Sequence, residues 1–400
     1  MSRNLFIPDI YDEFGVMDSI EEYFRTHARQ DSLSLSAISL DLILLSEVFD
    51  YIVYKELWLN IIYRKLEAAK QLIATYYHET RLFGGLLEFT IALKLINNKT
   101  GYFAKPLETI NRTVRQVINK KLQQNMQDIK SLTISDYDLI AGATGIGVFL
   151  LYMDNHLTES LSLLNTYFST LCATNGSNYG WFIKYENQLQ TNEEMSKYKF
   201  GHYDCGAAHG IAGPLFILSQ IHERKYNINN YLSINQVLNF YKSIEYKVDD
   251  IFTWPGKVSP FKEVPLPYVN ISWCYGYTGI FNTLLSAYSA LGYNAEIAHL
   301  LDNSVRLWRK LNVDSSKMYL RTRTLCHGYA GVLCGMTRTF NLTNDPSLLN
   351  NISLLRQYII STMTKLNNRV SLLEGIQGVL LALLYSINRD TQFESLLLLN

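Results

Sequence analysis

The sequence has 400 residues and equal numbers of basic and acidic side chains, 36 Lys plus Arg against 36 Asp plus Glu. This balance, and the lack of a basic run with interleaved aromatic residues, argues against a nucleic-acid-binding surface. The five cysteines are too few and too scattered for a disulfide framework and suit a reducing cytosol. No apolar run approaches the roughly 18–20 residues of a membrane span, so we expect a soluble globular protein.

A short phrase recurs along the chain: a small or polar lead, then Gly-x-x-Gly, then an apolar run. Five copies keep both glycines, at residues 142–145, 210–213, 276–279, 328–331 and 375–378. Two degenerate copies precede them, one around residues 82–88 and one at 35–40 that has lost both glycines. Seven copies spaced roughly 45–70 residues apart are typical of a helical array built from one repeated unit.

Two kinds of helix alternate in this array. The run after each glycine pair, as at 378–385, is apolar nearly all round, which predicts burial on several sides. The intervening segments, such as 300–311 and 354–366, carry apolar side chains on one face only. We therefore predict an all-α fold, a single domain over residues 1–400 that forms a seven-fold α/α toroid with an inner ring of helices inside an outer one. The glycines permit tight entry into each inner helix and place the helix N-termini at one mouth.

Two stretches break the helical pattern, residues 175–200 and 250–269. The first carries glycines and aromatic or β-branched residues around Trp181, and the second holds four of the eight prolines. Both patterns predict loops or short strands inserted between helices. Loops this long in a compact domain are usually functional.

Cysteine and histidine stand directly before the glycine pairs of the fifth and sixth copies, as Cys274, Cys326 and His327. If consecutive copies bring equivalent loops together, these side chains converge. Two thiolates and one imidazole suit zinc, and three protein ligands leave a fourth position open for catalysis. The alternative is that the cysteines pack as small hydrophobes and the histidine caps a helix. Packing is the interpretation that we keep for the remaining cysteines, Cys172, Cys205 and Cys334.

The fourth copy has His209 at the offset that Tyr275 and His327 occupy in theirs. A histidine there is a candidate general acid or base, with helix capping as the alternative. His202 lies close enough in sequence to compete for this role. Asp138 of the third copy could orient and charge-balance His209, or could simply favour the helix dipole.

Aromatic side chains flank the first candidate ligand. Trp273 precedes Cys274 and Tyr275 follows it. Either aromatic residue could shape the pocket or belong to the core, so the sequence leaves both roles open.

The phrases Ala-His-Gly-x-x-Gly, Ser-Trp-Cys-Tyr-Gly-x-x-Gly and Cys-His-Gly-x-x-Gly, in this order and spacing, resemble the lanthionine synthetase C family, the cyclases of lanthipeptide (lantibiotic) biosynthesis. The resemblance runs from about Asp138 to Gly378 and extends weakly to the N-terminus. It implies a seven-fold α/α toroid with a small inserted lobe. It also implies that peptide cysteine thiols add to dehydroalanine and dehydrobutyrine, forming lanthionine and methyllanthionine thioethers.

The resemblance assigns roles to residues of this chain. It implies that His209 and Asp138 serve in the acid/base step, in which His209 accepts the thiol proton or protonates the enolate. It implies that Tyr275 lies near the metal. Family members often carry an arginine four residues before the first zinc cysteine, where this chain has Asn270. Another cation therefore substitutes, or enolate stabilisation rests on zinc and His209. The implied ligands of one zinc ion per chain are Cys274, Cys326 and His327.

The chain length resembles that of the free-standing class I cyclases. Their partners are the dehydrated precursor peptide (leader plus core), a separate dehydratase and an exporter at the membrane. We therefore expect a cytoplasmic protein, free or peripheral at the inner face of the cell membrane. Residues 175–200 and 250–269 are the candidates for leader-peptide docking.

Two other functions compete with this one. A protein prenyltransferase-like zinc enzyme is also an α/α barrel that activates a peptide thiol, although its site typically uses a carboxylate, a cysteine and a histidine. A non-catalytic toroid could bind a peptide or glutathione without forming a thioether. Normal peptide binding without thioether formation would favour the second.

Overall fold

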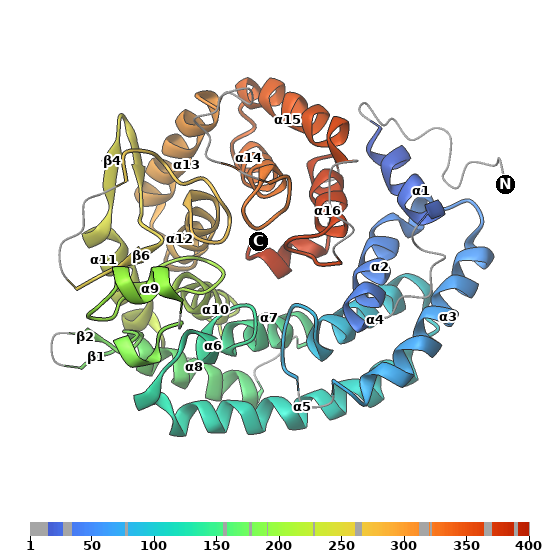
Figure 1. Ribbon diagram of the computed structural model, residues 1–400, viewed down its shortest axis with the longest axis horizontal. Coiled ribbons are helices and arrows are strands. Elements are labelled where there is room, and N and C mark those ends of the chain that lie inside the picture. The colour runs from blue at the N-terminus through green and yellow to red at the C-terminus, as the bar shows by residue number, and fades with distance from the viewer. Residues whose placement is uncertain are drawn as a thin grey trace.

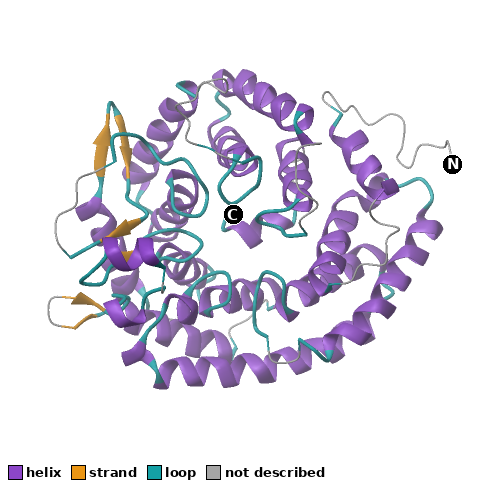
Figure 2. Ribbon diagram, viewed as in Figure 1, coloured by secondary structure: helices purple, strands orange, loops and turns teal. Residues whose placement is uncertain are grey.

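The structure is a computed structural model, and it describes residues 15–26, 34–76, 79–154, 158–175, 178–189, 191–226, 229–260, 266–311, 320, 322–363, 370–387 and 391–399. Helices dominate this part of the chain, and the few strands gather at one side of the molecule (Figure 2). The predicted all-α class is therefore confirmed. Among the described helices, none combines the length and apolar character that crossing a membrane requires.

The inner layer of the described chain consists of seven helices: α2 (Leu35–Val48), α4 (Leu86–Thr100), α7 (Ala143–Met153), α10 (Ala212–Glu223), α12 (Tyr277–Leu291), α14 (Tyr329–Thr343) and α16 (Ile376–Ile387). Each inner helix contacts the next, and α16 contacts α2, so that the ring closes (Figure 1). Nearly every residue of α2, α12 and α16 is buried. This burial is the physical reason for their apolar character on all sides.

The outer layer pairs each inner helix with an amphipathic one: α1 (Val16–Thr26), α3 (Lys55–Ile73), α5 (Ala104–Gln127), α8 (Glu159–Cys172), α11 (Tyr231–Ile244), α13 (Asn294–Arg309) and α15 (Leu349–Ser361). The stripe on α5 is the simplest, since Ile110, Val114, Ile118 and Leu122 recur every fourth residue and are all buried. The predicted amphipathic segments correspond to α13 and α15, and residues 364–366 lie outside the described chain. The seven-fold, two-layered toroid is confirmed.

The short elements complete the described chain: α6 (Ile134–Tyr137), α9 (Asn192–Lys197), and the 3-10 turns η1 (Phe49–Tyr51), η2 (Ile129–Ser131), η3 (Tyr185–Asn187), η5 (Pro346–Leu348) and η7 (Phe393–Leu397). Three antiparallel pairs of strands are present: β1 (Thr174–Asn175) with β2 (Asn178–Tyr179), β3 (Tyr203–Asp204) with β6 (Lys257–Val258), and β4 (Tyr246–Val248) with β5 (Ile251–Thr253). We call β1–β6, η3 and α9 together the inserted lobe.

The inserted lobe contains the described parts of the two stretches that break the helical pattern, together with the strands β3 and β4, which lie just outside them. The strand β3, which directly follows the first stretch, pairs with β6 in the middle of the second. Trp181 stacks on Tyr179 at a centroid distance of 4.4 Å and contacts Phe240 of α11 edge-on at 5.2 Å. These aromatic contacts fasten the lobe to the outer layer. For the described residues of the two stretches the prediction of loops and short strands holds, except that α9 is a short helix, capped by Thr191. Residues 176–177, 190 and 261–265 of these stretches lie outside the described chain.

A buried polar network closes the ring between its first and last helices. Asp41 of α2 accepts a hydrogen bond from Tyr23 of α1 (2.6 Å) and forms an ion pair with Lys65 of α3 (2.6 Å). Gln377 of α16 donates to the Tyr23 hydroxyl (3.0 Å). Because a buried charge is stable only when it is paired and hydrogen-bonded, this network specifies how the two ends of the helical array meet.

The segment 391–399 returns to the middle of the ring, where the C-terminal label lies in Figure 1. Its η7 turn is anchored by the indole N–H of Trp273, which donates to the Leu397 carbonyl (2.9 Å). Buried Glu47 of α2 accepts from the backbone N–H groups of Gln392 (2.7 Å) and Phe393 (3.1 Å). No sequence pattern predicted this return, because its partners are far away along the chain.

Candidate metal centre

The loops before consecutive inner helices are joined by a row of backbone hydrogen bonds at one mouth of the ring. In the fourth, fifth and sixth copies, the residue two places before the first glycine donates its N–H to the equivalent carbonyl of the next loop. Ala208 bonds to Cys274 (3.3 Å), Cys274 to Cys326 (3.4 Å), and Cys326 to Leu373 (2.9 Å). Side chains at equivalent positions of neighbouring repeats therefore lie side by side.

The second glycine of a pair lets its helix approach the loop that carries the cysteine. A Cβ atom on Gly279 would lie 2.0 Å from the carbonyl oxygen of Trp273, and one on Gly331 would lie 2.1 Å from that of Leu325. No side chain fits at either position. Since Trp273 and Leu325 directly precede the two cysteines, these close approaches also position the cysteines.

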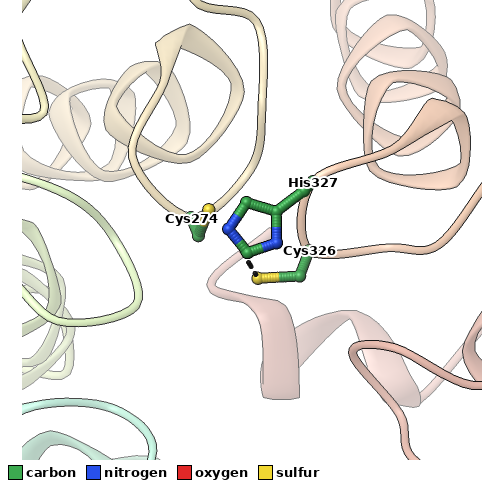
Figure 3. A group of neighbouring side chains, drawn as sticks. All are labelled: Cys274, Cys326 and His327. Atoms are coloured by element: carbon green, nitrogen blue, oxygen red, sulfur yellow. Dashed lines mark hydrogen bonds between the residues drawn. The ribbon is translucent and has the colours of Figure 1, made fainter. Parts of the chain in front are cut away.

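Cys274, Cys326 and His327 converge as predicted, and their ligand atoms all lie within 4.8 Å of one another (Figure 3). Both cysteines are buried, whereas the His327 side chain is 54% exposed. Ligands about 2.3 Å (sulfur) and 2.0–2.1 Å (nitrogen) from a tetrahedral zinc would lie about 3.5–3.8 Å apart. The donor set and its spacing therefore fit one metal ion.

Glu374 supports this cluster, and the sequence analysis assigned it no role. The Nδ1–H group of His327 donates to Glu374 Oε1 (3.0 Å), which leaves Nε2 for the cluster. A carboxylate behind a metal-binding histidine fixes the tautomer and orientation of the ring. A signal was present in the sequence, because Glu374 precedes Gly375 as His327 precedes Gly328.

The cluster favours a thiolate beside an imidazolium. Hydrogen bonding with the Cys326 thiol lowers the pKa of Cys274 to about 5 against the opposing effect of burial, and His327 lowers it further. The Cys274 thiolate and the Glu374 carboxylate raise the pKa of His327 to about 9, although burial opposes this. The neighbouring Cys274 also raises the pKa of the Cys326 thiol, since two adjacent thiols do not ionise together without a cation. Cys274 is therefore the more acidic thiol.

His209 and Asp138 are paired at the same mouth. His209 Nδ1 lies 2.7 Å from Asp138 Oδ2, while Asp138 Oδ1 accepts from the N–H groups of Ala141 (2.9 Å) and Gly142 (2.8 Å). Burial lowers the pKa of His209, but the hydrogen bond and charge of Asp138 outweigh it, so that the pKa is raised. The His209 side chain is 34% exposed, so its free nitrogen can reach a bound molecule.

His202 does not compete for this position. It is fully buried in the inserted lobe, where its Nδ1 contacts Gln188 Oε1 (3.2 Å) and its ring lies 4.8 Å from that of Tyr198. Burial and the charge of Lys257 lower the pKa of His202 to about 3. His202 is therefore a neutral residue of the lobe interior.

The two aromatic neighbours of Cys274 have different environments. Trp273 is fully buried and anchors Leu397, so it belongs to the core. Tyr275 is partly buried, and its ring centroid lies 5.8 Å from that of His209. Asn270 shapes the loop: its side-chain oxygen accepts from the N–H of Ser272 (3.1 Å), and its carbonyl oxygen accepts from Tyr277 (2.6 Å).

The other three cysteines lie in the interior and take no part in the cluster. Burial raises the pKa of Cys172 and of Cys334 well above the ordinary thiol value. Cys205 is equally buried. Among the described residues, Cys274, Cys326 and His327 form the one group of three that could hold a metal ion.

A closed ring of paired helices with a Cys–Cys–His cluster at its mouth defines a toroidal protein with a candidate catalytic metal centre. The sequence matches the family model described as "Lanthionine synthetase C-like protein" over residues 35–398. The chain belongs to this family.

One relative and one solved structure show how far the similarity extends. The chain is 26% identical over 343 residues to the nisin biosynthesis protein NisC of Lactococcus lactis subsp. lactis, which covers 79% of this chain and 77% of that protein. The structure resembles that of nisin cyclase with a TM-score of 0.78 at 20% identity, covering 95% of each chain. This structural likeness supports the toroidal fold.

Proposed function

We propose that the protein is a zinc-dependent lanthipeptide cyclase, which adds cysteine thiols of a peptide to dehydroalanine and dehydrobutyrine residues of the same peptide. The main support for the proposal is that two groups of side chains lie at the same mouth of the ring. The Cys274, Cys326 and His327 cluster and the His209–Asp138 pair lie on loops joined by the Ala208–Cys274 and Cys274–Cys326 backbone bonds. Family membership agrees with this chemistry.

In the proposed centre, Cys274, Cys326 and His327 would hold one zinc ion. When bound, zinc supplies Lewis-acid chemistry that favours the thiolate form of a coordinating thiol. Glu374 would hold the His327 ring in its ligating orientation.

His209 would supply the proton that completes the addition. The thiol sulfur forms a bond to Cβ of the dehydro residue, the double-bond electrons move to the adjacent carbonyl as an enolate, and a proton is delivered to Cα. The thiol loses one proton and Cα gains one, so the overall reaction is an isomerisation of the peptide. Asp138 engages Nδ1 of His209, which leaves Nε2 to donate, and the raised pKa keeps the ring protonated to higher pH.

The proposed substrate is a dehydrated precursor peptide with a leader and a core. We assign leader docking to residues 175–200 and 250–269, within a single domain over residues 1–400. The support is that both stretches expose large apolar side chains, namely Leu189, Phe200 and Leu266. A cytoplasmic location, a dehydratase and a membrane exporter as partners complete the proposal. Phe200→Ser together with Leu189→Ser would then weaken leader binding without loss of zinc, and unchanged binding would refute this docking site.

The experiment that tests the proposed activity counts free thiols. Zinc-loaded protein is mixed with a dehydrated precursor peptide, and the remaining thiols are alkylated and counted by mass spectrometry, because cyclisation alone leaves the mass unchanged. We expect alkylation to disappear with the wild-type protein and to persist with Cys274→Ala. Peptide binding with every thiol still alkylated would indicate a non-catalytic scaffold, and a prenyl adduct formed from a prenyl diphosphate would indicate the prenyltransferase-like alternative.

A further inference from the structure

Lys257 of β6 extends from the inserted lobe to the mouth of the ring. Its strand pairs with β3 so that Lys257 stands opposite Asp204, six residues before the first glycine of the fourth copy. The Lys257 ammonium lies 3.0 Å from Glu194 Oε1 of α9 and 3.4 Å from Asp204 Oδ2. Only 14% of the Lys257 side chain is exposed, and Asp204 is fully buried. One cation therefore joins the carboxylate of α9 to the carboxylate of β3, in the strand that leads to His209, where screening by water is weak.

The same ammonium lies beside Tyr275, 5.5 Å from the ring centroid. The backbone next to Lys257 packs on this residue directly, since a Cβ atom on Gly256 would lie 2.8 Å from the Tyr275 carbonyl oxygen. The Gly256 carbonyl in turn accepts from the N–H of Cys205 (2.8 Å). Tyr275 is thus enclosed by the lobe strand and by the segment that leads to His209.

The Lys257 ammonium and the backbone of Gly256 both lie against Tyr275. Within the described residues, no hydrogen bond fixes its hydroxyl group. A cation within about 6 Å of an aromatic centroid is attracted to the ring, more strongly when water is excluded. The His209 ring lies 5.8 Å from the Tyr275 ring, so the position of Tyr275 bounds the space available to His209.

We propose that Lys257 is a positioning residue, which the inserted lobe presents in order to hold Tyr275 beside His209. This inference rests on the proposed cyclase function and deepens it. It assigns the lobe a second task besides peptide docking, because Lys257 links the lobe to the loop that carries Cys274.

The test compares Lys257→Met and Lys257→Arg with a matched control. Lys242→Met is that control, since Lys242 also lies near a carboxylate (Glu296, 3.6 Å) and a tyrosine ring (Tyr288, 6.0 Å), but on the outer helix α11. For Lys257→Met we expect unchanged zinc content, a KM for the peptide within about twofold, and a kcat lowered roughly tenfold. Lys257→Arg should recover most of kcat, and Lys242→Met should keep it all.

A second readout does not depend on turnover. Amide hydrogen exchange of residues 270–276 should be faster in Lys257→Met than in the wild type and in Lys242→Met. If the wild type formed no thioether, the proposed cyclase function would be wrong. The exchange comparison would still test the role of Lys257, because it does not require turnover. If Lys257→Met does not fold, the double variant Lys257→Met, Glu194→Gln takes its place. Glu194→Gln removes one of the two carboxylates that Lys257→Met leaves without a cation. The double variant should show the lowered kcat and the faster exchange. Wild-type kcat and exchange in a folded Lys257→Met or double variant, or a change in KM alone, would overturn the proposal.

Discussion

The amide nitrogen of Cys274 donates a hydrogen bond to the carbonyl oxygen of Cys326 at 3.4 Å. The two residues hold the same place in consecutive repeats, just before α12 and α14. A bond between equivalent backbone positions places the two side chains next to each other, and His327 follows as the neighbour of Cys326. The repeated unit therefore builds the candidate metal centre by its own geometry.

The three-ligand cluster predicts the metal content of single variants. Purified wild-type protein should contain about one zinc ion per chain, and Cys274→Ala and His327→Ala should each lose it, because two remaining ligands bind weakly. Elemental analysis of dialysed protein measures this. Cys172→Ala, which alters a buried cysteine of α8, is the control and should keep its zinc. Full zinc in both ligand variants would rule out this centre.

Glu374 should contribute to zinc affinity without binding the ion. Glu374→Gln weakens the hydrogen bond that orients His327, so the zinc dissociation constant should rise about 10- to 100-fold. Competition with a chromophoric chelator measures the change. Glu296→Gln, on the outer helix α13, should leave the affinity unaltered. An unaltered affinity in Glu374→Gln would mean that the hydrogen bond has no influence on the metal.

Asp138 should set the pH range of the proposed reaction. The carboxylate raises the pKa of His209, and burial alone would lower it. If His209 donates a proton, activity falls as the pH rises through its pKa, so Asp138→Asn should move that fall to lower pH. The pH dependence of kcat/KM measures the shift, and His209→Ala should lower kcat about 10²- to 10⁴-fold at all pH values. A shift to higher pH in Asp138→Asn would contradict the assigned pair.

Glu88 predicts a pH dependence of stability that is separate from the metal centre. Burial raises the pKa of Glu88 to about 8 even though Ser36 and Gly84 donate hydrogen bonds to it. Between about pH 4.5 and 8 the folded protein retains this proton and the unfolded chain has lost it. The free energy of unfolding contributed by Glu88 therefore falls as the pH rises through this window.

Glu88→Gln should remove that loss, because glutamine does not ionise. Relative to the wild type, the variant should gain about 2–4 kcal/mol in free energy of unfolding between pH 5 and pH 8. Urea unfolding at the two pH values measures this difference. Glu67→Gln, at an exposed position of α3, should show none. A constant difference between Glu88→Gln and the wild type would show that Glu88 is ionised in the folded protein.

The fold was largely predictable because its signals are local. The apolar runs after the glycine pairs and the amphipathic stripe of α5 reflect the environment of each helix, and periodicity records that environment directly. The ligand triad was predictable for a related reason, since equivalent positions of adjacent repeats become neighbours. Position relative to Gly276 and Gly328 was sufficient to place Cys274, Cys326 and His327.

Other parts of the site depended on contacts between distant segments. Lys257 lies in a proline-rich stretch without periodicity, and only the pairing of β6 with β3 brings it to Asp204 and Tyr275. Glu374 has the right offset from its glycine, but a glutamate there is equally suited to a helix N-terminus. Its role became visible only through the 3.0 Å contact with His327.

The sequence by itself determined the repeated helical unit, the number of repeats and the residue types at the mouth, because each follows from local pattern and offset. The tertiary structure decided which copies touch, which histidine faces the centre, and how the inserted lobe and segment 391–399 meet the ring. Asp138 pairs with His209, whereas His202 contacts Gln188 in the lobe. Trp273 anchors Leu397. The His209–Asp138 and Trp273–Leu397 contacts arise from close packing between segments far apart in the chain. Such packing is a property of the tertiary structure, since each contact joins side chains that belong to different segments of the chain.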